Sequence, residues 1–583
     1  MEKRVFLAVA LSVAVLLAYN ALFPPPKRPA TVPAETSTQA QPAAQPAAAP
    51  VEAPSKPAPQ PPPTTAPAGE SLVGETAERE TVVENDAVRA TFSTRGGVIT
   101  SWRLKHYAEN GQPLDLIPRS TPAGLAKPFT LITDDQDVNA TLEKALFKPS
   151  TDSLNTTTAP GSLSLEYRDA SGLSVTKEFS FSPDRPYDIV FSASVSKSEA
   201  ALVPTIAWGP ALGTGRVSSG MTYAPSSQPV YYRDHDVSRV GFDKIAEHRV
   251  VEGSIGFGGA DDHYFLTAIV SPGPQARLQY DPVLVQVPGS DRPLHFVSWA
   301  VRLPAAPSKV RFFAGPKDFD VLQKTDPDLV RAIHFGMFAW LVVPLLRALK
   351  WVNTYVGNYG WSIIALTVII NLVMFPLRHK SVVSMRKMQE LQPEVKAIQD
   401  RYAKLKMSDP ARQKMNVELM NLYRERGVNP ASGCVPMLLT LPVLFAFYSM
   451  LSVAIELRGA PFVGWIKDLS TYDPWFVTPI VMGLTQFVQQ KMTPATGDPT
   501  QQRMMMFMPI ALTGIFLSLP SGLAIYYLVT NIFQISQQYL TNYRLGKPSA
   551  PPAARPVSDG RMKSAGSGKS SGAAGLKQGE RKA

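Results

Sequence analysis

One apolar stretch near the middle of the chain dominates the pattern of hydrophobic and polar positions. Residues Trp361–Leu377 read WSIIALTVIINLVMFPL, long enough to cross a bilayer, and they are followed at once by Arg378, His379 and Lys380. Thr367 and Asn371 interrupt the stretch one helical turn apart, so they share a face. Because an amide is costly in hydrocarbon without partners, Asn371 either bonds a neighbouring helix or lines a polar cavity. Both interpretations are open at this point.

Further apolar runs predict a polytopic α-helical membrane protein with six transmembrane helices, the last five forming its core. The first run, residues 1–23, lacks an A-x-A-like cleavage site, which favours an uncleaved anchor over a signal peptide. The other spans are predicted at 358–378, 432–456, 474–490, 503–519 and 521–541. Residues 326–352 are amphipathic, but their unbroken apolar core is short and contains Pro344. A helix lying in the outer membrane interface is therefore expected there.

Between the first two spans the pattern changes twice. Residues 24–75 are rich in Pro and Ala, which predicts a disordered, extended linker. From 80 to 318 apolar and polar residues alternate, as at Leu163, Leu165 and Tyr167, and turn residues separate the runs. This predicts a large all-β sandwich of antiparallel strands on the outer side of the membrane. Its clusters of Asp and His, at 234–236 and 261–263, are interpreted as solvated turns, so no catalytic site is expected.

The charged segment 379–430 predicts a cytoplasmic helical hairpin. Apolar residues in its first half are spaced by four and three, as in a coiled-coil seam. A second apolar stripe follows Asp409-Pro410, a typical helix start. The first stripe is Leu391, Val395, Ile398, Tyr402 and Leu405, and the second is Met415, Leu419 and Leu422. Packing of two helices against each other explains both stripes.

The net charge of +11 is concentrated beside the predicted spans. The segment from Arg378 to Pro430 carries +6 and that from Arg544 to Ala583 carries +7, which leaves −2 for the rest. Basic segments mark the cytoplasmic side, so both termini are placed inside the cell and the β-sandwich outside. The 544–583 tail is expected to be disordered, and the basic excess suits anionic lipid or RNA. A single cysteine excludes an intramolecular disulfide, and the histidines lack metal-ligand spacing, so neither a metal nor a cofactor is expected.

Uncharged polar side chains recur within the predicted spans. Those of the last span, at helical spacing, form one polar face: Tyr527, Thr530, Asn531 and Gln534. Candidates to lie opposite are Thr367, Asn371, Thr440 and Gln486. No acidic or basic residue is expected at depth in the five-span core. Two spans hold about 14 to 16 apolar residues, or roughly 21 to 24 Å of helix, so the bilayer beside them is expected to thin. A wet groove beside a thin bilayer lowers the barrier for a polar peptide segment to cross.

Several motifs, in this order, resemble the Oxa-type membrane protein insertase family, in its form with a large periplasmic domain. They are Gly357-Asn358-Tyr359-Gly360, Met374-Phe375-Pro376-Leu377, Asn429-Pro430, Gly433-Cys434-Val435-Pro436, Leu441-Pro442, Gln490-Lys491-Met492-Thr493-Pro494, Phe507-Met508-Pro509, Pro520-Ser521-Gly522-Leu523 and Tyr526-Tyr527. The resemblance implies an insertase and chaperone of the inner membrane. It implies that nascent membrane proteins pass along a hydrophilic groove, alone or beside the Sec translocon.

The resemblance also implies roles for particular residues. Thr367 and Tyr527 match groove positions that contact the client, and the basic tail and hairpin suggest a ribosome contact, whereas DNA is not expected as a partner. The family very often has Arg where this sequence has Asn371. Here hydration and hydrogen bonding by the amide, which both donates and accepts, are expected to replace a buried cation.

Two other functions stand as alternatives. A secondary transporter with an outer ligand-binding domain requires intramembrane charges and repeat symmetry, and neither is visible in the sequence. A tethered periplasmic enzyme requires a catalytic constellation, and none emerges. The prediction is an insertase that performs no covalent chemistry.

Overall fold

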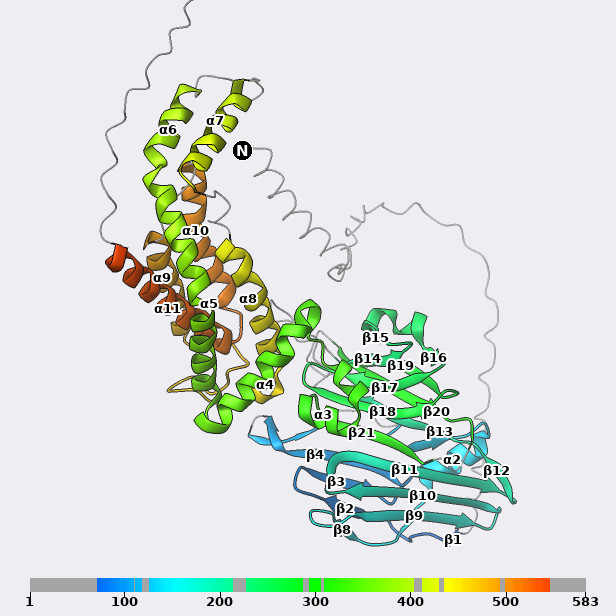
Figure 1. Ribbon diagram of the computed structural model, residues 1–583. Coiled ribbons are helices and arrows are strands. Elements are labelled where there is room, and N and C mark those ends of the chain that lie inside the picture. Colours follow the sequence, from blue (N-terminus) through cyan, green and yellow to red (C-terminus); the bar gives the residue numbers. More distant parts are fainter. Residues whose placement is uncertain are drawn as a thin grey trace, which may run out of the picture.

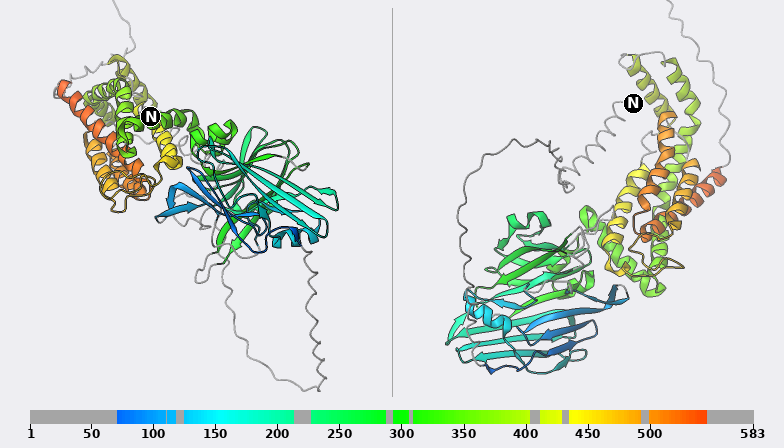
Figure 2. Two further views of the ribbon diagram at one scale, coloured as in Figure 1. Left: turned by 90° about the horizontal axis from the view of Figure 1, so that it is seen from below. Right: turned by 180° about the vertical axis from the view of Figure 1, so that it is seen from behind.

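The computed structural model consists of a β-domain and a helical region (Figure 1). It describes residues 71–109, 111–117, 125–212, 227–286, 293–305, 309–402, 411–428, 435–492 and 499–545. The predicted anchor at 1–23, most of the linker at 24–75 and nearly all of the 544–583 tail lie outside these ranges. Figure 2 shows the β-domain and the helical region as two bodies side by side.

Three sheets make up the β-domain. The largest has the strand order β1 (Ser71–Val73), β9 (Gly161–Asp169), β10 (Leu173–Ser182), β11 (Arg185–Lys197), β21 (Val310–Pro316), β18 (Phe265–Gly273), β17 (Ile255–Asp261), β14 (Gln228–Arg233) and β15 (Asp236–Arg239), with β12 (Ala200–Leu202) on β11 and β7 (Lys148–Pro149) on β9. The second has the order β16 (Val250–Glu252), β19 (Arg277–Val285), β20 (Leu294–Arg302), β13 (Thr205–Ala211) and β6 (Thr130–Ile132). The third has the order β5 (Gln112–Asp115), β4 (Val98–Glu109), β3 (Val88–Ser93), β2 (Glu80–Glu84) and β8 (Ser153–Asn155).

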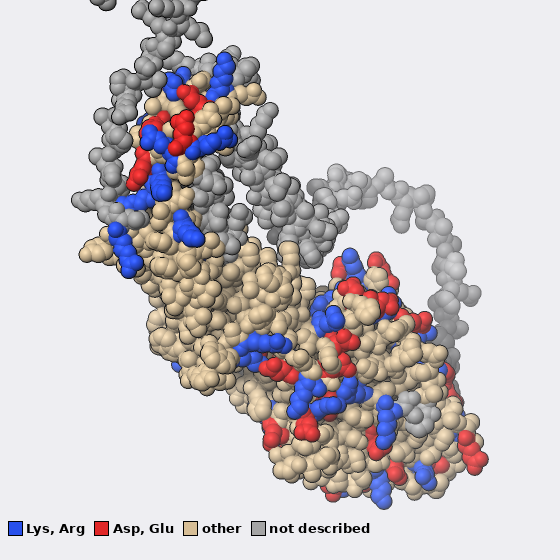
Figure 3. All heavy atoms as spheres, in the orientation of Figure 1, with Lys and Arg blue, Asp and Glu red and all other residues tan. Residues whose placement is uncertain are grey.

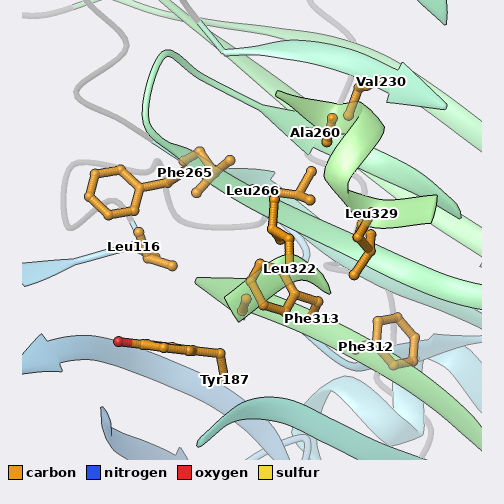
Figure 4. Packing of buried hydrophobic residues seen from close by; sticks show 14 of the residues in the cluster. Leu116, Tyr187, Val230, Ala260, Phe265, Leu266, Phe312, Phe313, Leu322 and Leu329 are labelled. Atoms are coloured by element: carbon orange, nitrogen blue, oxygen red, sulfur yellow. The ribbon is translucent and has the colours of Figure 1, made fainter. Parts of the chain in front are cut away.

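Alternating burial along the strands builds the core between the sheets. On β10 every second residue is buried, and Phe179 lies opposite Leu163 of β9 and Phe191 of β11. The rings of Phe179 and Phe191 also contact Phe129, with centroids 5.1 and 4.7 Å away. Figure 4 shows a neighbouring part of this core, where side chains from β18, β21 and the segment after β21 converge. The period-two pattern thus places its apolar face inside, as expected for half-buried strands.

Two features of the β-domain differ from the predicted antiparallel all-β sandwich. Strand β2 pairs with β8 in parallel, because the chain returns to this sheet edge after crossing other elements. A helix, α2 (Gln136–Lys144), follows β6, and its N-cap Asp135 accepts hydrogen bonds from the backbone of Asp137 and Val138. Such a capped helix of nine residues is too short to show a clear period in the sequence.

A buried cation lies in the core of the β-domain. The Lys177 side chain of β10 is 1% exposed and donates to three backbone carbonyls, those of Gly96, Gly97 and Phe129, at 2.7 to 3.0 Å. All three of these residues have positive φ angles, of 72°, 57° and 69°. The left-handed backbone turns their carbonyls toward one point, which the ammonium group occupies.

Short helices connect the β-domain to the helical region. They are α3 (Phe319–Thr325), η2 (Pro327–Ala332) and η3 (Gly336–Phe338), and α4 (Ala339–Val356) follows. The predicted interfacial helix at 326–352 is therefore divided into η2, η3 and α4, and its regular part begins at Ala339. It ends at Gly357, whose φ of 70° gives the left-handed C-cap that glycine adopts easily. Three aromatic side chains of α4 are exposed, Trp340, Trp351 and Tyr355, and its placement in the membrane interface stays a prediction.

The helical region contains α5 (Tyr359–Glu390), α8 (Val435–Val453), α9 (Val477–Met492), α10 (Pro499–Phe516) and α11 (Ser521–Leu545). Two further short 3-10 helices are η1 (Phe242–His248), between β15 and β16, and η5 (Ile455–Leu457), between α8 and α9. Among the described residues, α5 is the one helix both long and apolar enough to cross a membrane unaided, and Leu441–Val453 and Met506–Phe516 are shorter apolar stretches. Helix α5 also runs 12 residues past the predicted end of its span at 378, so the first arm of the predicted hairpin begins as its continuation.

Helices α6 (Gln392–Arg401) and α7 (Ala411–Glu425) pack side by side through a small core of their own. Leu391, Ile398 and Leu419 are buried there, and the remaining described members of the two predicted stripes, Val395, Tyr402, Met415 and Leu422, pack against them. Leu405 lies outside the described residues. Two exposed ion pairs flank this core, Arg401 with Glu418 and Arg426 with Glu394.

Candidate functional site

The start of α5 is fixed by the motif that precedes it. Asn358 is the N-cap, and its side-chain oxygen accepts from the backbone of Gly360 and Trp361 at 2.9 and 3.2 Å. Its amide nitrogen donates to the carbonyl of Pro461 at 3.1 Å, which ties the helix to the loop before α9. A Cβ at Gly360 would lie 2.1 Å from the ring of Phe462, so only glycine permits this approach. The motif thereby sets the position of the polar residues further along α5.

A ladder of hydrogen bonds follows one face of α5. The hydroxyl of Thr367 donates to the carbonyl of Ile363 at 2.6 Å, and the amide of Asn371 donates to the carbonyl of Thr367 at 2.8 Å. The side-chain oxygen of Asn371 accepts from Nη1 of Arg378 at 2.9 Å. Thr367, Asn371 and Arg378 are all buried. Asn371 is therefore the acceptor for a buried guanidinium two turns further along the helix.

This position of Arg378 corrects the prediction that the core holds no charge at depth. The sequence pattern assigns Arg378 to the basic flank of the span, but α5 continues past it and the side chain turns back along the helix. In an α-helix the Cα–Cβ bonds tilt toward the N-terminus, so a long side chain reaches the turn before its own. The signal that was available is the spacing of seven residues from Asn371, which places both side chains on one face.

Helix α11 lies against both α5 and α9 and presents polar side chains to each. Toward α9, the amide of Asn531 donates to the carbonyl of Met482 at 3.2 Å and to the hydroxyl of Thr485 at 3.3 Å. Gln486 of α9 is also buried, and its side-chain oxygen has no hydrogen-bond partner among the described residues. A buried acceptor without a donor is costly, so this site favours an incoming N–H or O–H group.

Toward α5, Gln534 completes the contact with the guanidinium. With its amide oxygen facing Arg378, Gln534 accepts from Nη1 at 2.7 Å and from Nη2 at 3.3 Å. The amide of Gln489 on α9 contacts Gln534 from the other side. One turn further, Gln537 donates to the carbonyl of Phe375 on α5 at 3.2 Å. Gln489 and Gln537 extend the polar face beyond the residues that the sequence pattern singled out.

We call the polar side chains along the contacts of α11 with α5 and with α9 the polar seam: Thr367, Asn371, Arg378, Gln486, Gln489, Asn531 and Gln534. Of the other predicted groove residues, Thr530 is buried on α11 near this seam. Tyr527 is partly buried, and its ring lies 5.4 Å from that of Phe516 on α10. Thr440 lies on α8, but its side chain is outside the described residues. In the described part of the chain no group of His, Cys, Asp and Glu side chains is arranged to hold a metal ion.

Comparison with known proteins decides the family. Residues 351–547 match the family profile described as 60Kd inner membrane protein, and residues 80–348 match the YidC periplasmic domain. The chain is 36% identical to a protein named "Membrane protein insertase YidC" from Geobacter sulfurreducens, over 94% of this chain and all of that one. The chain belongs to the YidC family. A second YidC relative, from Cupriavidus necator, is 34% identical over 84% of this chain and 87% of its own length.

Membership of the YidC family fixes the coarse layout. The chain is an inner-membrane protein with a helical region, and its β-domain is the YidC periplasmic domain. A solved structure titled "Active YidC insertase crystal structure with the first transmembrane domain resolved" also matches, with 19% identity over 81% of this chain and 95% of that one, at a TM-score of 0.33. The YidC relatives carry the name of insertases and not of enzymes, and no match favours the transporter alternative.

Proposed function

We propose that this YidC-family protein is a membrane protein insertase that receives polar parts of a nascent membrane protein at the polar seam. The observation that carries the proposal is the bonded set of Asn371, Arg378 and Gln534, which joins α5 to α11 inside the helical region. A membrane-buried region seldom keeps a guanidinium and several amides without a functional use. Here they offer donors and acceptors to a peptide that has left water.

The exchange of hydrogen bonds gives a physical route for insertion. An arriving backbone segment donates to Gln486 and accepts from the amide of Asn531, which gives up its bond to Thr485, so the segment loses water without being left unbonded. The guanidinium of Arg378 attracts acidic side chains of the client. This assigns to Arg378 the role that the family resemblance attaches to the position of Asn371. No covalent step is involved.

The proposed topology has five spans in the core, α5, α8, α9, α10 and α11, preceded by the 1–23 anchor, with both termini and the α6–α7 hairpin in the cytoplasm. On the face shown in Figure 3, a band with few charged side chains separates the charged hairpin from the charged β-domain. Such a band suits a hydrocarbon layer. Helix α9 has 16 residues, or roughly 24 Å, against a hydrocarbon layer of about 30 Å, so the bilayer thins beside it.

The partners follow from this topology. Nascent membrane proteins are the clients, received alone or beside the Sec translocon, and the basic hairpin and tail face the ribosome in the cytoplasm. The basic segments attract RNA and anionic lipid by charge. Chaperoning of clients after insertion is part of the same proposal, because a segment held at the polar seam folds while it stays bonded there.

The test compares replacements in the polar seam, and at the neighbouring groove residue Tyr527, with one outside both. The triple change Thr367→Leu, Asn371→Leu and Tyr527→Leu is expected to impair insertion of clients with short translocated loops while the protein still accumulates. Ser536→Leu is the matched control, because Ser536 is exposed on α11 and its hydroxyl donates to the carbonyl of Ile532 in the same helix. Normal insertion by the triple variant contradicts a role for the seam.

Arg378 is tested separately with clients of different charge. Arg378→Gln keeps a hydrogen-bond donor but removes the charge, so it is expected to slow clients with acidic translocated loops several-fold more than clients with neutral ones. Arg378→Lys keeps the charge and is expected to lie between the parent and Arg378→Gln. Equal effects on both classes of client show that hydrogen bonding, and not charge, is what this residue supplies.

A further inference from the structure

A polar cluster joins three parts of the chain at the outer end of the helical region. The ammonium of Lys350 on α4 lies 3.3 Å from Asp318, which precedes α3, 2.5 Å from Asp320 on α3, and 3.0 Å from Glu456 on η5, just after α8. Two of these acids are well covered, with Asp318 16% and Glu456 7% exposed. Asp318 and Asp320 belong to one segment, and Glu456 lies more than 100 residues further along the sequence.

Two acids of the cluster, Asp318 and Glu456, also lie at the end of a helix. Asp318 is the N-cap of α3 and accepts from the backbone of Asp320 and Val321 at 2.8 and 3.1 Å. Glu456 follows α8 directly, and the backbone after it continues into the loop that reaches α9. Moving Lys350 away therefore releases the start of α3 and the end of α8 at the same time.

Other contacts bring the same parts together without charge pairing. His263 of the β-domain donates from Nε2 to the carbonyl of Ser452 on α8, and the hydroxyl of Ser449 on α8 donates to the carbonyl of Phe335 at 2.7 Å. The guanidinium of Arg458 lies over the ring of Phe265. The β-domain is thus in contact with the outer end of α8, and the chain connection through α4 is not its sole attachment.

We propose that Lys350 is a positioning residue that locks α4, the outer end of α8 and the β-domain into one body. This inference goes beyond the insertase function and does not depend on the role of the polar seam. Lys350 neutralises buried acids from both sides of the junction, and removing it leaves Asp318 and Glu456 facing each other without their shared cation. Two like charges held close in a covered site repel, so the junction opens.

The charges around the junction predict that neutralising Lys350 opens the junction more than neutralising Glu456 does. Burial raises the pKa of Glu456, although Lys350 opposes this, so the ionised carboxylate is costly at this place. For Lys350, burial would lower the pKa, but Glu456, Asp320 and Asp318 together raise it, so the lysine stays charged. Tyr107 of β4 and Tyr359 of α5 also face this cluster. A neutral amide at 456 is therefore tolerated, whereas a neutral side chain at 350 is not.

The experiment measures how often the junction opens. In a Cys434→Ser background, Ala454→Cys places one thiol between α8 and Glu456, at a position that is 3% exposed. The full-length protein in membrane vesicles is labelled from the outer side with a membrane-impermeant maleimide. Lys350→Met is expected to raise the labelling rate at least about tenfold. Glu456→Gln alone is expected to change it by less than about twofold, and adding it to Lys350→Met is expected to restore most of the protection.

Two controls separate positioning from general damage. Lys350→Arg keeps the charge and is expected to label like the parent, and Lys324→Met removes an exposed lysine from α3 close to the cluster. Insertion of a short-loop client is expected to fall with Lys350→Met and to recover when Glu456→Gln is added. Unchanged labelling in Lys350→Met overturns the proposal, and so does a double variant that labels as fast as Lys350→Met. Because labelling is measured without a client, either result leaves the polar seam unaffected.

Discussion

The buried lysine of the β-domain makes the stability of this domain depend on pH in a direction that can be worked out. Burial lowers the pKa of Lys177 to about 7, far below the usual value for lysine. Between pH 7 and the unfolded value of about 10.4, the unfolded chain binds a proton that the folded domain has released. Unfolding therefore takes up a proton in this range, and the free energy of unfolding rises as the pH rises.

The size of the effect follows from the linkage relation. At about 1.4 kcal/mol per pH unit, and allowing for half-titration at pH 7, raising the pH to 9 adds about 2 kcal/mol to the free energy of unfolding. For a domain of this size, that corresponds to an increase in Tm of roughly 4 to 8 °C. Lys177→Met removes the titrating group, so the variant lacks this part of the pH dependence, whatever its stability at pH 7.

The assay is thermal unfolding of the detergent-solubilised protein at pH 7, 8 and 9, followed by intrinsic fluorescence. The quantity of interest is the difference in pH slope between the parent and Lys177→Met, because other titrating groups contribute equally to both. Lys148→Met, at an exposed lysine on β7, is the matched control and is expected to keep the parental slope. If the slopes of the parent and Lys177→Met coincide, the buried ammonium is not destabilised, and its three carbonyl partners offset the loss of water.

Two more predictions concern the helical region. Asp473 accepts four hydrogen bonds, from the indole N–H of Trp465, the backbone of Trp475, and the backbone and hydroxyl of Thr478. Asp473→Ala is therefore expected to cost about 2–4 kcal/mol and to lower the Tm of the helical region, and an unchanged Tm would show that the loop before α9 does not limit stability. Deleting Leu391–Leu422 is expected to abolish growth in a depletion strain, whereas deleting most of the β-domain ahead of Asp318 is expected to be tolerated; the opposite pattern would place the working part in the β-domain.

Local sequence patterns predict the helices and strands of this chain better than they predict which of these elements pair or pack together. Alternation at Leu163, Leu165 and Tyr167 predicts β-strands, and all three side chains are buried on β9. The same pattern says nothing about which strands pair, so the parallel pair of β2 and β8 was not foreseen. Strand pairing over long distances depends on packing of the whole domain, which periodicity does not record.

In the helical region, too, local patterns predict the elements but not all of the contacts between them. The stripes at Leu391 and Leu419 predict two helices that pack together, and the structure places both side chains in one small core. The ladder from Thr367 to Asn371 also follows from spacing. The bonds of Gln489 and Gln534 do not, because they depend on how closely α9 approaches α11, and no pattern within either helix encodes that distance.

Asn371 and Arg378 together show why a charge cannot be located from sequence position alone. Seven residues of helix separate their Cα atoms by roughly 10.5 Å, which puts Arg378 in the predicted flank. The arginine side chain turns back toward the N-terminus of α5, so its Nη1 reaches Asn371 at 2.9 Å, and the positive charge lies at the depth of the amide. An arginine at 371 has no acceptor to offer a second guanidinium and would repel it, whereas asparagine supplies an oxygen. The asparagine and the arginine are therefore complementary, and the cation beside Asn371 comes from a residue two turns further along the same helix.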